Sequence, residues 1–134
     1  MAQLLDASLW IDFTRPRSSR TLKLFLAPFV LDPATHLAEP IVFEVLRHAT
    51  PAESKGIVRQ FQTLPLLATP ATLWSDAADL GQHCRQKGIT VNSIDLLVAA
   101  LAIHHDAEVI TFDDDFQKIA TVTNLRAKLL KRPS

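Results

Sequence analysis

Short apolar segments alternate with amphipathic ones along the whole chain, a pattern typical of a sheet whose strands are joined by helices. The apolar segments predict strands at 3–5, near Leu37 and at 108–111, with weaker extended pieces at 64–68 and 121–125. The amphipathic segments predict helices at 9–13, 22–26, 40–50, 52–61, 70–87, 94–103 and 116–120. Strands that alternate with helices run parallel, so we predict one three-layer α/β/α domain with a central parallel sheet over residues 1–134.

Particular residues mark where the predicted helices begin and end. Ser8 is a good N-cap, and Pro40 is suited to the first helical position. Gly88 is expected to end the long helix over 70–87, because glycine readily adopts the left-handed conformation found there. Asn92 or Ser93 is expected to cap the next helix.

Composition excludes several classes of function. The three glycines cannot form a Walker A loop or a dinucleotide-binding fingerprint, and no G-x-S-x-G elbow is present for a serine hydrolase. The single cysteine excludes an internal disulfide framework and a cysteine-based zinc site. The longest apolar run, residues 96–103, is far shorter than the ~18 residues that a membrane span needs. With no basic signal-like segment at the start, we expect a cytoplasmic protein.

Charge is balanced overall but unevenly distributed. Fourteen basic residues match fourteen acidic ones, which argues against an indiscriminate polyanion-binding protein. Residues 106–115 hold five acids and no base, and the basic end at 126–134 is predicted to be a flexible tail. A second basic run is a candidate for phosphate contacts, although such a run is commonly just a solvated face: Arg15, Arg17, Arg20 and Lys23.

Four acids occur where acids are costly. Asp6 ends the first predicted strand, and Asp113 lies two residues beyond the strongest one. Glu44 and Asp95 interrupt otherwise apolar helical segments. Burying an unpaired carboxylate costs several kcal/mol or forces its protonation. A hard divalent cation resolves this problem, because Mg²⁺ and Mn²⁺ prefer carboxylate and water oxygens.

Each acid also has a purely structural interpretation. Glu44 could pair with Arg47 or His48 on the same helix face. Asp95 could complement the helix dipole in the first turn. The two acids at strand ends could belong to ordinary turns. The functional interpretation is favoured because acids that follow parallel strands meet at one edge of the sheet, where sites form.

Four sequence blocks resemble a PIN-domain nuclease, specifically a VapC-type toxin of a type II toxin–antitoxin pair. The blocks are L-D-A-S-L-W-I at 5–11, E-V-L at 44–46, D-L-L-V-A-A at 95–100 and T-F-D-D-D-F at 111–116. The resemblance extends from residue 4 to about residue 125. One departure is His105-Asp106-Ala107, where relatives often have a glycine before the strand. This alters a turn and adds a charge without touching a matched catalytic position.

The resemblance implies a metal-dependent endoribonuclease with Mg²⁺ as cofactor, for which Mn²⁺ can substitute. It implies tRNA or ribosomal RNA as substrate, a cognate antitoxin as partner, a homodimer and no membrane association. Whether one or two ions act is open. The catalytic and metal-binding acids implied are Asp6, Glu44, Asp95 and Asp113, with Ser8 and Asp115 in support.

Two other functions have weaker support in the sequence. A phospho-accepting receiver domain needs paired acids after the first strand and a lysine after the last core strand. Here Asp6 stands alone, and acids follow Thr111 where the lysine belongs. A PIN-like module that binds RNA or a partner without turnover is the remaining alternative, although the complete acidic set argues against it.

Overall fold

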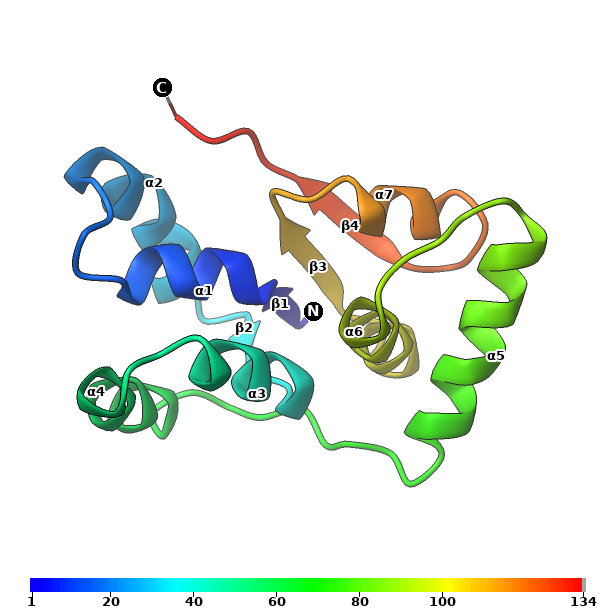
Figure 1. The fold of residues 1–134 in the computed structure, drawn as a ribbon, viewed down its shortest axis with the longest axis horizontal. Helices are drawn as coiled ribbons and strands as arrows, with labels where there is room; N and C mark the ends of the chain where they lie inside the picture. Colours follow the sequence, from blue (N-terminus) through cyan, green and yellow to red (C-terminus); the bar gives the residue numbers. More distant parts are fainter. Residues whose placement is uncertain (134) are drawn as a thin grey trace.

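The computed structural model describes residues 1–133 and has a four-stranded, all-parallel sheet at its centre (Figure 1). The strand order is β2-β1-β3-β4. Leu5 of β1 lies opposite Ile110 of β3, so these two central strands end side by side. The strands are β1 (Gln3–Leu5), β2 (Thr35–His36), β3 (Glu108–Thr111) and β4 (Arg126–Leu129).

Helices flank this sheet, which confirms the predicted three-layer α/β/α architecture. Within the described residues they are α1 (Ala7–Thr14), α2 (Arg20–Leu31), α3 (Glu39–Arg47), α4 (Pro51–Phe61), α5 (Leu73–Gln86), α6 (Ser93–His105) and α7 (Asp115–Ala120). Helix α5 packs on α6 at the outer side of the molecule (Figure 1). Leu4, Val109 and Ile110 are almost completely buried, as expected for strands covered on both faces.

The order in which the strands are connected creates a switch point at the centre of the sheet. The chain passes from β1 to β2 on one side, and then returns past β1 to place β3 on its other side. The connections that leave β1 and β3 therefore diverge in opposite directions. In open parallel sheets such a point opens a crevice beyond the carboxyl ends of the strands.

Several predicted helix boundaries need correction. Helix α1 begins at Ala7 with Asp6 as N-cap, so Ser8 is not the cap; its hydroxyl instead donates to the Asp6 carboxylate. Pro40 is the second residue of α3 and not the first. Helix α5 begins at Leu73, because Pro70 belongs to a preceding turn in which its carbonyl accepts the Leu73 N–H.

Other boundaries agree better with the sequence pattern. Asn92 is confirmed as the N-cap of α6, and Gly88 follows α5 with a φ of 79°. Asp106, at the departure from the usual glycine, has a φ of 53° and ends α6 in the left-handed conformation. Aspartate tolerates this conformation better than most residues, so the turn keeps a glycine-like backbone.

The C-terminal prediction is wrong in two respects. The last strand is β4 at Arg126–Leu129 and not 121–125, and residues 126–129 are therefore not a flexible tail. Beyond the strand, Arg132 pairs with Asp12 at 2.9 Å and lies over the Phe112 ring. Basic residues are common on edge strands, where they discourage pairing with other chains, and here they led to the prediction of a tail. The segment 64–68 forms only one bridge, between Leu66 and Leu37.

We predict that ending the chain after Leu125 lowers its stability. This truncation removes β4 and the hydrogen bond that Gln117 on α7 donates to the Ala127 carbonyl. Removing a hydrogen bond costs about 0.5–1.5 kcal/mol, so the melting temperature should fall by several degrees or more. Ending the chain after Leu129 is the matched control and should have a much smaller effect. Equal melting temperatures for both truncations would show that β4 contributes no stability.

Candidate active site

The four acids singled out in the sequence line one cavity of about 520 Å³ at the switch point. Asp6 follows β1 and Asp113 follows β3, and these strands are neighbours in the sheet. Glu44 and Asp95 enter the same cavity from α3 and α6, which pack against each other. The fold thus brings together residues that are far apart in the sequence, and we name this space the acidic cavity.

Asp6 is fixed by two hydroxyl groups. Ser8 Oγ donates to Asp6 Oδ2 at 3.1 Å, and Thr111 Oγ1 donates to the same oxygen at 3.0 Å. The Asp6 side chain makes no cap hydrogen bond to α1, although Asp6 is the N-cap residue. Burial raises the pKa of Asp6, while the hydroxyl hydrogen bonds partly offset that effect.

Thr111 links the two central strands at their carboxyl ends. Its hydroxyl donates to Asp6 beyond β1 and accepts the backbone N–H of Asp113 at 2.9 Å. The Thr111 side chain is completely buried. This single hydroxyl therefore fixes one acid through its carboxylate and another through its backbone.

Asp95 is the most perturbed acid of the site. Burial raises its pKa to about 7, and the nearby carboxylates of Asp6, Asp113 and Asp115 raise it in the same direction. Asn92 both caps the helix and steadies this side chain. Its Oδ1 accepts the Asp95 N–H at 2.9 Å, and its Nδ2 donates to Asp95 Oδ2 at 3.0 Å.

Three carboxylates are arranged as a metal ion would need them. One oxygen from each of Asp95, Asp113 and Asp115 lies within 4.8 Å of the other two. Asp113 Oδ1 also accepts the backbone N–H of Asp115 at 3.0 Å, which fixes the two residues relative to each other. An all-oxygen set of like charges suits a hard divalent cation such as Mg²⁺ or Mn²⁺.

The two carboxylate oxygens of Glu44 have different surroundings. Its Oε1 accepts from Arg47 at 2.8 Å and lies 3.1 Å from His48 Nε2. The hydrogen bond from Arg47, assisted by His48, holds the pKa of Glu44 below its usual value. Its Oε2 is buried and has no hydrogen-bond partner among the described residues. The ion pairing that the sequence allows is present, and it leaves one oxygen free for another ligand.

Two contributors to the site are not identified by the sequence pattern. Thr111 belongs to one of the four blocks but has no implied role, and Asn92 is expected there only as a cap. Thr111 carries a usable signal, since a hydroxyl at the end of a buried strand needs a partner there.

Asp115 lies with Asp95 and Asp113 in the closest group of carboxylates, whereas Asp6 faces Asp113 from the neighbouring strand.

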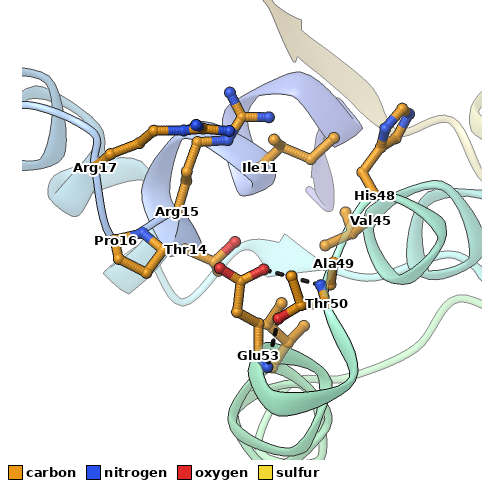
Figure 2. Close-up of a pocket in the computed structure, with 11 residues that line it drawn as sticks. Ile11, Thr14, Arg15, Pro16, Arg17, Val45, His48, Ala49, Thr50 and Glu53 are labelled. Atoms are coloured by element: carbon orange, nitrogen blue, oxygen red, sulfur yellow. Dashed lines mark hydrogen bonds between the residues drawn. The ribbon is translucent and has the colours of Figure 1, made fainter.

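The basic run predicted to contact phosphate is divided by the structure. Arg15 and Arg17 line a cavity of about 360 Å³ next to the acidic one (Figure 2). Arg20 and Lys23 lie on α2 and line neither cavity. Asp6 and Asp113 also border a wide cavity whose lining includes Lys131 and Arg132. Positive charge thus flanks the acidic cavity on two sides.

Comparisons with known proteins agree with this architecture. A family model described as PIN domain matches residues 4–122. The VapC ribonuclease Mb1587 of Mycobacterium bovis is 34% identical over 129 residues, covering 92% of this chain and 96% of that protein. Ribonuclease VapC11 of Mycobacterium tuberculosis matches to the same extent.

Solved structures share the fold at low sequence identity. VapBC2 from Rickettsia felis, bound to a DNA fragment from its promoter, matches with a TM-score of 0.76 at 15% identity over 98% of this chain and 100% of that chain. VapBC-1 from nontypeable Haemophilus influenzae gives a TM-score of 0.71 at 17% identity over 96% and 98%. Among the described residues, no helix is long and apolar enough to cross a membrane.

We predict that the metal-free protein becomes less stable as pH rises from about 4 to about 7. Over this range folded Asp95, with its pKa of about 7, holds a proton that the unfolded chain releases near pH 4. Asp95→Asn should remove most of this slope, and the raised pKa of Asp6 should account for the remainder. Melting temperatures in chelator across this pH range test the prediction, with Asp114→Asn as control. A slope unchanged in Asp95→Asn would contradict it.

We further predict that Thr111→Val weakens both folding and metal binding. Valine keeps the shape but leaves Asp6 without one donor and the Asp113 N–H without its acceptor. Unfolding in denaturant should show a loss of about 1–3 kcal/mol, and calorimetry should show weaker Mn²⁺ binding. Thr111→Ser keeps the hydroxyl and should retain metal affinity. A valine variant with unchanged metal affinity would remove Thr111 from the site.

Proposed function

The chain belongs to the PIN domain family and, within it, to the VapC ribonucleases, and from this premise we propose that it is a metal-dependent endoribonuclease that acts as a toxin. The observation that carries the proposal is the convergence of Asp6, Glu44, Asp95 and Asp113 on one cavity. Four acids in one small space oppose folding unless something offsets their charge. Such a cluster of acids is expected in a site that binds a cation together with a phosphodiester.

The residues present fit Mg²⁺ or Mn²⁺. Asp95, Asp113 and Asp115 offer clustered oxygens, and the unpartnered Oε2 of Glu44 is a further donor. We propose that these residues and Asp6 hold the metal, directly or through water. When bound, such an ion lowers the pKa of a water molecule and neutralises phosphate oxygens.

The chain's own residues position these groups and prepare them for the substrate. Thr111 and Asn92 fix Asp6 and Asp95, so the carboxylates need little rearrangement. Arg47 lines the acidic cavity and uses one terminal nitrogen to hold Glu44. A guanidinium has five N–H donors, so others remain to stabilise negative charge on a phosphate oxygen.

We propose RNA as substrate and a cognate antitoxin and a second copy of the chain as partners. The curated relatives are named as ribonucleases, and the similar solved structures are described as VapBC proteins. Exposed apolar side chains on α2, Leu24 at 60% and Leu31 at 78% exposure, provide surface that a protein partner would cover.

We predict that the purified chain cleaves RNA only when Mg²⁺ or Mn²⁺ is supplied. Asp95→Asn and Asp113→Asn should each reduce cleavage about 100-fold or more, because losing a metal ligand removes several kcal/mol of transition-state stabilisation. Asp114→Asn, which removes an acid from the same loop, is the matched control. RNA and DNA of the same sequence should be followed on denaturing gels in chelator, Mg²⁺ and Mn²⁺.

Each alternative gives a different result in this experiment. Cleavage that persists in chelator would contradict metal dependence. Binding of both RNA and Mn²⁺ without cleavage would favour the PIN-like binding module that lacks turnover. Cleavage of DNA in preference to RNA would contradict the proposed substrate.

A further inference from the structure

A second cavity lies between the end of α1 and the junction of α3 with α4 (Figure 2). It has a volume of about 360 Å³. Arg15 and Arg17 form one side of it, His48 lies on the other, and Thr50 and Glu53 line its base in the view of Figure 2. We name this space the basic cavity.

The basic cavity adjoins the acidic cavity. Ile11 and His48 line both, so the two spaces meet across these side chains. Helix α1 runs between them, with Asp6 before its first residue and Arg15 after its last. At about 1.5 Å rise per residue, these two ends lie roughly 13 Å apart along the helix axis.

Within the described residues, the positive charge in the basic cavity is not used. Neither Arg15 nor Arg17 makes an ion pair among the described residues. The one acid in the lining, Glu53, is engaged locally: its Oε1 accepts the backbone N–H of Thr50 in a capping box. The cavity therefore offers two guanidinium groups to a ligand that is anionic.

We propose that the basic cavity binds a phosphate of the RNA strand a few nucleotides away from the phosphate held in the acidic cavity. This inference rests on the proposed ribonuclease function and adds the direction in which the strand leaves the site. A nucleic acid fits both cavities at once, because its phosphates recur along one backbone and one of them must lie beside the metal ligands. Arginine suits this role, since its planar fork pairs with two phosphate oxygens.

Binding of a labelled single-stranded RNA of random sequence tests the proposal. The protein carries Asp95→Asn throughout so that the RNA is not cut, and affinity is measured over a range of salt concentrations. Arg15→Ala/Arg17→Ala should reduce the slope of log affinity against log salt by about 0.7, because the charge of one phosphate is no longer neutralised. At 0.1 M salt that change in slope corresponds to about 5-fold weaker binding.

Arg20→Ala/Lys23→Ala provides the matched comparison, because it removes the same charge from the same run but from outside both cavities. It should change the slope much less. Equal effects of the two double variants would overturn the proposal in favour of general attraction by surface charge. An unchanged slope in Arg15→Ala/Arg17→Ala would overturn it directly. Melting temperatures are measured to establish whether each double variant folds. Arg15→Gln/Arg17→Gln replaces Arg15→Ala/Arg17→Ala if the alanine variant does not fold.

The remaining outcomes separate this inference from the function on which it rests. If the unsubstituted chain neither binds nor cuts RNA, the proposed function fails and the inference falls with it. If it cuts RNA but Arg15→Ala/Arg17→Ala binds RNA normally, only the inference fails. A polyglutamate peptide is tested in parallel. Loss of peptide binding with intact RNA binding would assign the cavity to an acidic protein segment instead.

Discussion

Burial of several carboxylates close together at the switch point is the constraint on which the rest of the site depends. Asp95 cannot lose its proton at low cost, because it is buried and faces Asp6, Asp113 and Asp115. In the folded chain, neutral donors hold these carboxylates in place. The hydroxyls of Ser8 and Thr111 donate to Asp6, and the side-chain amide of Asn92 donates to Asp95. Neutral donors fix the carboxylates without neutralising them, so the attraction for a cation is preserved.

The sequence predicted the parallel sheet and the acids of the site because both depend on local patterns. Strand 108–111 has an apolar centre at Val109 and Ile110, and an acid just beyond such a strand is conspicuous. What the sequence could not predict also has a physical reason. The Thr111 hydroxyl that binds the Asp6 carboxylate lies more than a hundred residues away in the sequence, so no local pattern around Asp6 reveals this contact. Strand β4 was misplaced because its alternating sequence R-A-K-L lies in a basic segment, which was interpreted as a tail, whereas an edge strand tolerates basic residues.

Glu44 shows why the structural and the functional interpretations of an acid need not exclude each other. The sequence allowed Glu44 either an ion pair within α3 or a role as metal ligand. Only the structure distinguishes its two carboxylate oxygens. Oε1 is held by Arg47 and His48, whereas Oε2 is buried without a partner among the described residues. The ion pair lowers the pKa of Glu44 and so keeps the carboxylate charged. One contact within the helix thereby maintains the charge that the free oxygen would offer to a metal.

A chain of zero net charge can still hold a polyanion if its charges are separated in space. The acidic cavity alone would repel RNA, and a uniformly basic surface would bind RNA without directing any phosphate to the acids proposed to hold the metal. Here the cavities on either side carry basic residues, Arg15 and Arg17 on one and Lys131 and Arg132 on the other. Arg132 is held over Phe112 by Asp12, so this flank is ordered as well. Attraction on both sides of a repulsive centre favours a strand that crosses it, and the phosphate at the crossing point is the one placed beside the acids.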